Sequence, residues 1–158
     1  MTTAPDPLSL TGETLRQAVE ARVRLSGSES LKAATHLLTF TDLLGRPDVA
    51  RHIRLRYETD EDGLEVLVAD VDLPALRDDD AVYLTGGDQR FLDLAISYLH
   101  GRPTDLSAYL NVFGHAHARR AIEAYIISLG MEGWYRLEEG AALAEHRAFE
   151  AELLGDPR

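Results

Sequence analysis

The stretch from residue 53 to residue 71 constrains the fold more than any other part of the chain. Apolar and polar residues alternate over residues 53–59, an acidic turn containing Gly63 follows, and residues 64–69 form a nearly continuous apolar run. Alternation is typical of a half-buried strand, and two such runs joined by a glycine-containing turn indicate a β-hairpin. Because Val66–Ala69 are apolar on both faces, we expect the second strand to lie centrally in its sheet.

A two-stranded ribbon is only marginally stable, so further strands are expected, at residues 81–85 and 134–137. Amphipathic helical patterns occupy most of the remaining chain on both sides of the hairpin. The sequence therefore predicts an α+β fold. In it a small, largely antiparallel sheet, made of hairpin 53–71 plus one or two further strands, packs against helices from both flanks. Residues 1–9 are expected to form a flexible tail, and residues 10–158 a single globular α+β domain.

The composition removes several kinds of chemistry. The 158 residues include no cysteine, which excludes disulfides, thiolate catalysis and cysteine-based metal centres. We find no secretory signal at the N-terminus and no apolar run long enough for a bilayer, so we expect a cytoplasmic protein. Lys32 is the single lysine among 16 basic residues, a bias that suggests a GC-rich bacterial genome.

The charge is strongly negative and unevenly distributed. The formal net charge is −11, and residues 58–80 contain ten acidic residues against one base. This field argues against nucleic acid or an anionic membrane as a partner and favours a protein partner, possibly a basic one. Asp78, Asp79 and Asp80 are the densest acidic run and become candidate interaction residues, although acidity can equally serve solubility alone.

A second pair of candidate interaction residues lies near the C-terminus. Trp134 and Tyr135 are adjacent, and these residue types dominate the binding energy of protein interfaces. The same pair could instead belong to a strand that closes the core. The segment 138–154 that follows is a predicted helix with few large apolar residues, which could dock weakly or contact a partner.

The histidines and the glycine pair do not form a known catalytic pattern. His115 and His117 are two positions apart, which on a helix points them about 200° from each other, so we predict no metal site. His100 or His115 could form a dyad with Asp88, Asp105 or Glu123, yet no nucleophile signature accompanies them. Gly86-Gly87-Asp88 matches no phosphate-binding motif and is interpreted as a turn with Asp88 as the N-cap of a helix. No catalytic residue and no cofactor is predicted.

These observations favour a non-enzymatic acidic adaptor, regulator or inhibitor that acts by protein–protein interaction, with a homo-oligomer possible. One alternative is a small enzyme or ligand-binding protein, with a pocket between the sheet and helices 89–129. Another is a winged-helix DNA-binding regulator, because Arg46, Arg51, Arg54 and Arg56 cluster before and within the hairpin. Against DNA binding, the hairpin tip at residues 60–62 is acidic and would repel phosphates.

Overall fold

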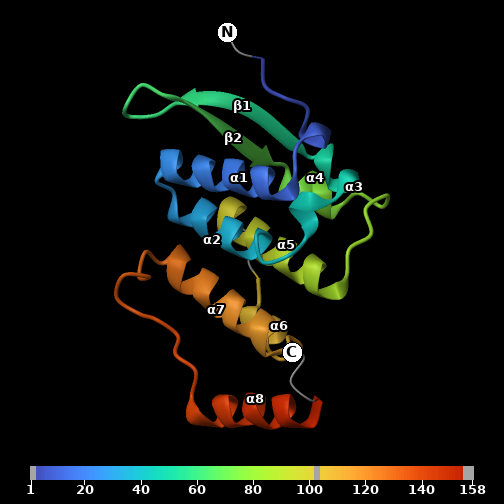
Figure 1. The fold of residues 1–158 in the computed structure, drawn as a ribbon, viewed down its shortest axis with the longest axis vertical. Coiled ribbons are helices and arrows are strands. Elements are labelled where there is room, and N and C mark those ends of the chain that lie inside the picture. The colour runs from blue at the N-terminus through green and yellow to red at the C-terminus, as the bar shows by residue number, and fades with distance from the viewer. Residues whose placement is uncertain (1–2, 102–103, 155–158) are drawn as a thin grey trace.

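The computed structural model describes residues 3–101 and 104–154, and it confirms an α+β fold with a small sheet packed against helices (Figure 1). The hairpin occupies one end of the molecule, and the helices extend away from it. In chain order the elements are η1 (Pro7–Ser9), α1 (Gly12–Ser26), α2 (Glu29–Leu38), η2 (Leu43–Gly45), α3 (Pro47–Ala50), β1 (Ile53–Thr59), β2 (Glu65–Val71), α4 (Leu73–Arg77), α5 (Gly86–His100), α6 (Leu106–Leu110), α7 (His115–Ser128) and α8 (Ala141–Leu154).

The predicted hairpin is present. Strands β1 and β2 pair antiparallel, from Ile53 opposite Val71 to Thr59 opposite Glu65. Their turn is closed by the Asp60 carboxylate, which accepts hydrogen bonds from the backbone N–H groups of Asp62 (3.0 Å) and Leu64 (2.9 Å). Gly63 has a φ of +80°, a left-handed conformation that glycine adopts without steric cost. At least one acidic residue of the hairpin tip, Asp60, therefore stabilises the turn itself.

The two further strands predicted at residues 81–85 and 134–137 are absent, and among the described residues the sheet has two strands only. Residues 81–85 form an irregular segment before α5. Val82 and Leu84 are buried while Ala81 and Tyr83 are exposed, so this segment inserts alternate side chains into the core without pairing its backbone. The alternation of apolar and polar residues in this segment therefore indicates which side chains are buried, and it does not indicate that the backbone pairs with another strand.

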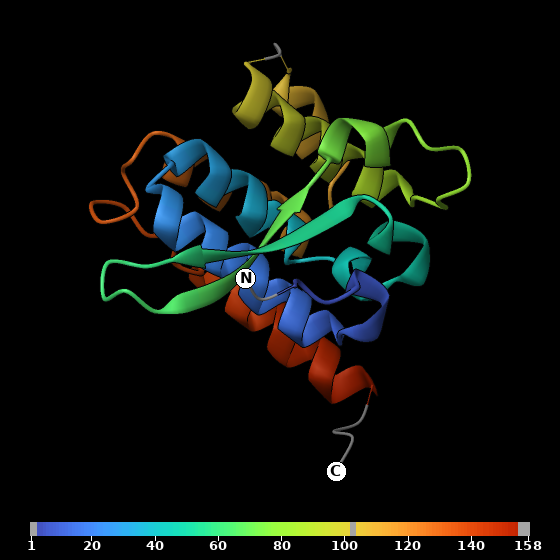
Figure 2. The ribbon, with the colours of Figure 1, turned by 90° about the horizontal axis from the view of Figure 1, so that it is seen from above.

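Helix α1, and not a third strand, is the second element that packs against β2. The side chains of Val68 and Ala69 project from opposite faces of β2, and both are buried. The expectation that β2 lies centrally in its sheet is wrong, because among the described residues β2 pairs with β1 alone. The apolar residues of β2 are covered instead by a helix, α1, which packs along the strand (Figures 1 and 2).

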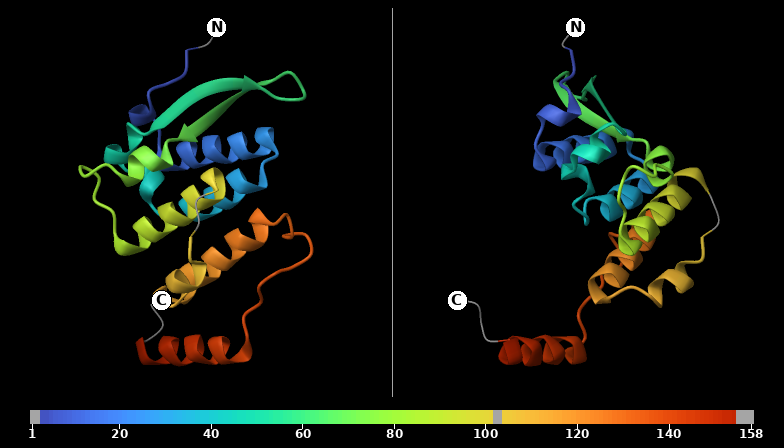
Figure 3. Two further views of the ribbon diagram at one scale, coloured as in Figure 1. Left: turned by 180° about the vertical axis from the view of Figure 1, so that it is seen from behind. Right: turned by 90° about the vertical axis from the view of Figure 1, so that its right-hand side faces the viewer.

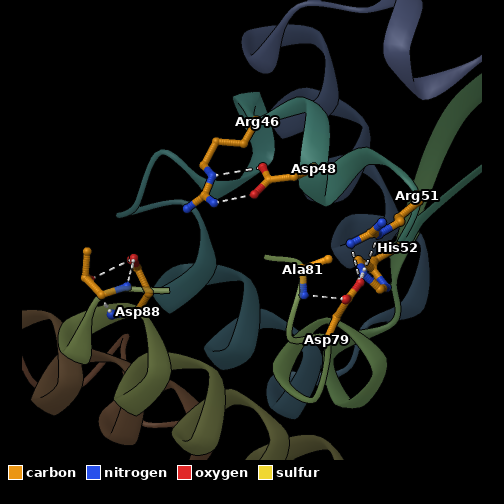
Figure 4. Close-up of polar contacts among 8 residues, drawn as sticks. Arg46, Asp48, Arg51, His52, Asp79, Ala81 and Asp88 are labelled. Carbon is orange, nitrogen blue, oxygen red and sulfur yellow. Dashed lines mark hydrogen bonds and ion pairs between the residues drawn. The ribbon is translucent and has the colours of Figure 1, made fainter. Parts of the chain in front are cut away.

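The helix boundaries follow capping residues. Thr11 caps α1 and Ser28 caps α2 through their side-chain oxygens. The prediction that Asp88 is an N-cap is wrong, because Gly86 and Gly87 are already helical. Thr85 is the N-cap of α5: its hydroxyl accepts from the Asp88 N–H (3.1 Å), while the Asp88 carboxylate accepts from the Thr85 N–H (3.0 Å), a reciprocal capping box (Figure 4).

The helices form successive layers below the hairpin. Helix α2 is central and packs against α1, α5 and α7, whereas α8 stands apart beyond α7 (Figures 1 and 3). In the described ranges, no helix is both long and apolar enough to cross a lipid bilayer. The buried core extends along the chain to Ile127, and its largest fully buried side chains are Phe91, Leu37, Leu43, Leu76, Leu92, Leu94, Val49 and Val68.

Candidate functional site

The C-terminal segment, defined here as residues 131–154, exposes large apolar side chains that the core does not use. Trp134 is 82% exposed and Tyr135 is 59% exposed. The interpretation of this pair as a strand closing the core is wrong: both backbone N–H groups donate to the carbonyl of Met131 in a turn that follows α7. Phe149 and Leu153 on α8 are also exposed. The segment therefore presents apolar surface on a backbone that projects from the core.

A groove lies directly beside Tyr135, between α2, α7 and the chain that follows α7. Its volume is about 330 Å³. Apolar contacts come from Ile126, Ile127 and Leu137, and the polar groups come from His36 on α2, from α7 and from the chain that follows α7. The full lining consists of His36, Arg119, Glu123, Ile126, Ile127, Glu132, Tyr135, Arg136 and Leu137. We refer to this concavity as the α2–α7 groove.

A histidine and a carboxylate form the polar centre of the α2–α7 groove. The Nε2 of His36 lies 3.0 Å from Oε2 of Glu123, whose other oxygen accepts from Nε of Arg119 at 2.8 Å. Burial lowers the pKa of His36, and the hydrogen bond to Glu123 offsets this effect only in part. Burial alone would raise the pKa of Glu123, but hydrogen bonds from Arg119 and His36 bring it below its usual value. At neutral pH a neutral His36 therefore donates its Nε2 proton to an ionised Glu123.

Charged contacts, rather than apolar packing, fix the C-terminal segment to the rest of the molecule. Arg119 on α7 donates to the carbonyl of Leu137 (3.2 Å) and pairs with Glu139 (3.3 Å). Glu139 also pairs with Arg147 of α8. Lys32 on α2 forms an ion pair with Glu132, at the start of the segment. The large side chains of Trp134, Tyr135, Phe149 and Leu153 remain exposed.

The acidic run is only partly available at the surface. Asp79 accepts hydrogen bonds from the Ala81 N–H (2.9 Å) and from Nε2 of His52 (2.8 Å), and it forms an ion pair with Arg51 (2.6 Å), as Figure 4 shows. The backbone N–H of Ala81 is the largest cause of a lowered pKa at Asp79. Asp79 therefore anchors the segment before α5 to the start of β1. Asp78 and Asp80 are exposed.

The histidines named from the sequence do not come together. His117 packs among the rings of Phe40, Phe91 and Phe113, with centroids 5.1–5.9 Å apart. His100 and His115 are exposed. In residues 3–101 and 104–154, no three histidine or acidic side chains gather as metal ligands would.

Glu123 does form a dyad, but its partner is His36, which sequence reasoning missed. The two residues lie 87 positions apart, and no local spacing relates them. The sequence places His36 and Glu123 on two predicted helices. It does not show that these helices, α2 and α7, pack against each other and so bring the two side chains together.

The arginine cluster behind the winged-helix interpretation is largely engaged within the chain. Arg46 pairs with Asp48 (2.5 Å; Figure 4), Arg51 with Asp79, and Arg56 with both Glu58 and Asp70. Neutralised guanidinium groups offer little free positive field to a phosphate backbone.

Comparison with known proteins gives no match: neither a protein-family model, nor a curated protein, nor a solved structure is similar to this chain.

Proposed function

We propose that the protein is a non-enzymatic adaptor, regulator or inhibitor that works in the cytoplasm by binding another protein. The observation that carries this proposal is the exposure of Trp134 and Tyr135 on a segment that projects from the core. Large aromatic side chains exposed together are unfavourable in water, and they are the residue types that anchor protein interfaces. The absence of cysteine is compatible with a reducing compartment.

The charge of the C-terminal segment defines the chemistry of the partner. Residues 131–154 contain six glutamates and two arginines. An apolar anchor within an acidic rim is complementary to an apolar depression bordered by lysine or arginine on the partner. A second copy of this chain fits less well, because each copy carries a net charge of −11.

The α2–α7 groove supplies the complementary half of the contact. An interface of this type often inserts a side chain from each partner into a pocket of the other. The groove is next to Tyr135, and its walls combine apolar contacts with His36, Glu123 and Arg136. It can accept one partner side chain while Trp134 enters the partner.

The test compares variants against one purified partner. Wild-type protein is used as bait in a lysate of its native host, the captured protein is identified and purified, and its affinity is measured by calorimetry. The double variant Trp134→Ala/Tyr135→Ala should weaken binding by at least about 30-fold, because one hot-spot residue alone typically contributes 2 kcal/mol or more. Its melting temperature should not change, since both side chains are exposed.

The matched control is Tyr83→Ala. Tyr83 is 77% exposed, but it lies in the segment before α5 rather than in the C-terminal segment. Its loss should leave the affinity unchanged. Equal affinities for the wild type and the double variant would refute the proposal.

A further inference from the structure

A second, open concavity adjoins the α2–α7 groove and extends from α1 across α2 to α7, three helices that follow one another in Figure 1. Its volume is about 370 Å³, which lies within the range of small-molecule sites. The lining consists of Glu20, Val23, Arg24, Lys32, Thr35, His36, Thr39, Arg120, Ile127 and Glu132. We refer to it as the α1–α2–α7 concavity.

Arginines without a carboxylate partner gather around these two concavities. Thirteen arginines lie in the described residues, and eight of them form ion pairs with a carboxylate there. The other five are Arg24, Arg54, Arg90, Arg120 and Arg136. Arg24 and Arg120 line the α1–α2–α7 concavity, and Arg136 lines the α2–α7 groove. In a chain with a net charge of −11, this region therefore keeps positive charge that is not neutralised locally.

Arg120 is the partly buried member of this group. Its Nε donates to the carbonyl of His36 (2.6 Å), and its Nη2 donates to Oγ1 of Thr39 (3.2 Å). Its guanidinium carbon lies 5.6 Å from the centroid of the Phe40 ring. Burial lowers the pKa of Arg120, and the charge of Glu123 offsets this effect in part.

The hydrogen bonds of Arg120 leave donors for a ligand. A guanidinium group has five N–H donors, and within the described residues three of those of Arg120 make no hydrogen bond. The two acceptors that it does use are a carbonyl and a hydroxyl, which carry no net charge. A partly desolvated guanidinium group with free donors and no carboxylate partner favours an anion from solution.

The remaining side chains of the lining favour a monoanionic carboxylate over other anions. The two oxygens of a carboxylate match the planar edge of a guanidinium group, which can donate two parallel hydrogen bonds. Glu20 and Glu132 line the same concavity, and they would repel the additional charge of a dianion such as hydrogen phosphate. Val23 and Ile127 add apolar surface that a short hydrocarbon chain could cover.

We propose that the α1–α2–α7 concavity binds a small monocarboxylate, with its carboxylate bonded to Arg120 and its hydrocarbon part against Val23 and Ile127. This site uses neither Trp134 nor Tyr135, so the proposal can fail while the protein-binding proposal holds. Because the walls of the site come from three helices, a bound carboxylate would stabilise the native state by mass action.

Butyrate, butyramide and phosphate are the probes. Butyrate and butyramide have nearly the same shape, but only butyrate is charged at neutral pH. Each probe is titrated into protein with ¹⁵N-labelled arginine and ¹³C-labelled valine and isoleucine methyl groups. Butyrate should give saturable shifts at the Nε–H of Arg120 and at the methyl groups of Val23 and Ile127, with one site per chain. Butyramide should bind at least about tenfold more weakly, because hydrogen bonds to a charged group are the stronger ones. Phosphate should also bind more weakly than butyrate.

Arg120→Lys keeps the positive charge but removes the planar edge, and it should weaken butyrate binding by about tenfold. Arg54→Gln is the matched control, because Arg54 is exposed on β1 and also forms no ion pair with a carboxylate among the described residues. It should leave the affinity for butyrate unchanged. If Arg120→Lys fails to fold, two substitutions at exposed positions of the lining replace it: Arg24→Gln should weaken butyrate binding, and Glu20→Gln should strengthen it.

The proposal is overturned if butyrate gives no saturable shift, or if butyramide or phosphate binds as tightly as butyrate. It is also overturned if Arg120→Lys and Arg54→Gln change the affinity for butyrate equally. Should Arg120→Lys not fold, the proposal is overturned if Arg24→Gln and Glu20→Gln do not change that affinity in opposite directions.

Discussion

At the scale of single residues, the environment of His36 opposes the protonation of its ring, because burial lowers its pKa. Its ring is partly buried between α2 and α7, where the positive charge of Arg120 adds to the effect of burial on its pKa. Glu123 holds the ring through Nε2, and Arg120 donates to the His36 carbonyl at 2.6 Å. His36, which lines the α2–α7 groove, is therefore held in its neutral form.

This arrangement predicts a specific dependence of stability on pH. The pKa of His36 is lower in the folded state than in the unfolded state, so the unfolded chain takes up the proton first as pH falls. Stability is therefore present above the unfolded pKa of about 6.5, and it declines as pH falls below that value until the folded pKa is passed. Urea unfolding of His36→Gln should show a smaller loss of stability between about pH 7 and pH 5 than the wild type.

His146→Gln provides the control, because His146 is exposed on α8. It should retain the wild-type dependence on pH. A His36→Gln variant with the same pH dependence as the wild type would contradict the burial argument for this side chain.

At the scale of elements, the sequence correctly predicted features that depend on residues close together in the chain. It failed for features that depend on contacts between distant segments. The hairpin was found correctly because its alternation, acidic turn and Gly63 are all local signals. Residues 81–85 were assigned wrongly as a strand because strand pairing requires a partner that the sequence does not reveal. The N-cap of α5 was expected at Asp88, because aspartate is a preferred N-cap residue, but it lies three residues earlier at Thr85.

The junction between α1 and η2 gives a testable consequence of close backbone packing. A Cβ atom at Gly12 would lie 2.9 Å from Cα of Gly45, a backbone atom that cannot rotate away. Gly12→Ala should therefore lower the free energy of unfolding by about 1–3 kcal/mol, although alanine normally favours a helix. Urea denaturation measures the change.

Gly140→Ala is the matched control, since a Cβ atom there would meet no atom within 4 Å. It should unfold like the wild type. If Gly12→Ala were as stable as this control, the close approach of α1 to η2 would not exist in solution.

At the scale of the whole molecule, the chain exposes more surface than a compact monomer requires. The accessible surface is 9,975 Å², whereas a compact protein of 17.5 kDa is expected to expose about 7,900 Å². Among the described residues, α8 packs extensively against no other element, and it contributes to this excess. A standard protein interface buries about 800 Å² on each partner, so the difference of about 2,100 Å² is more than one such interface would cover.

The sequence anticipated only part of the candidate site. It singled out Trp134 and Tyr135 by residue type, and it noted that segment 138–154 is poor in large apolar residues. Whether this pair closes the core or faces solvent depends on where the core ends, and among the residues that the structure describes the last core residue is Ile127. The α2–α7 groove could not be foreseen, because its walls come from segments about 90 residues apart.

Site-specific photo-crosslinking in the native host tests the protein-binding proposal most directly. One strain carries p-benzoylphenylalanine in place of Trp134, and a control strain carries it in place of Tyr83, which is equally exposed but lies elsewhere on the surface. Irradiation should yield one discrete adduct with a different protein from position 134 and none from position 83. The proposal would be contradicted if position 134 gave no adduct, an adduct containing only this chain, or the same adducts as position 83.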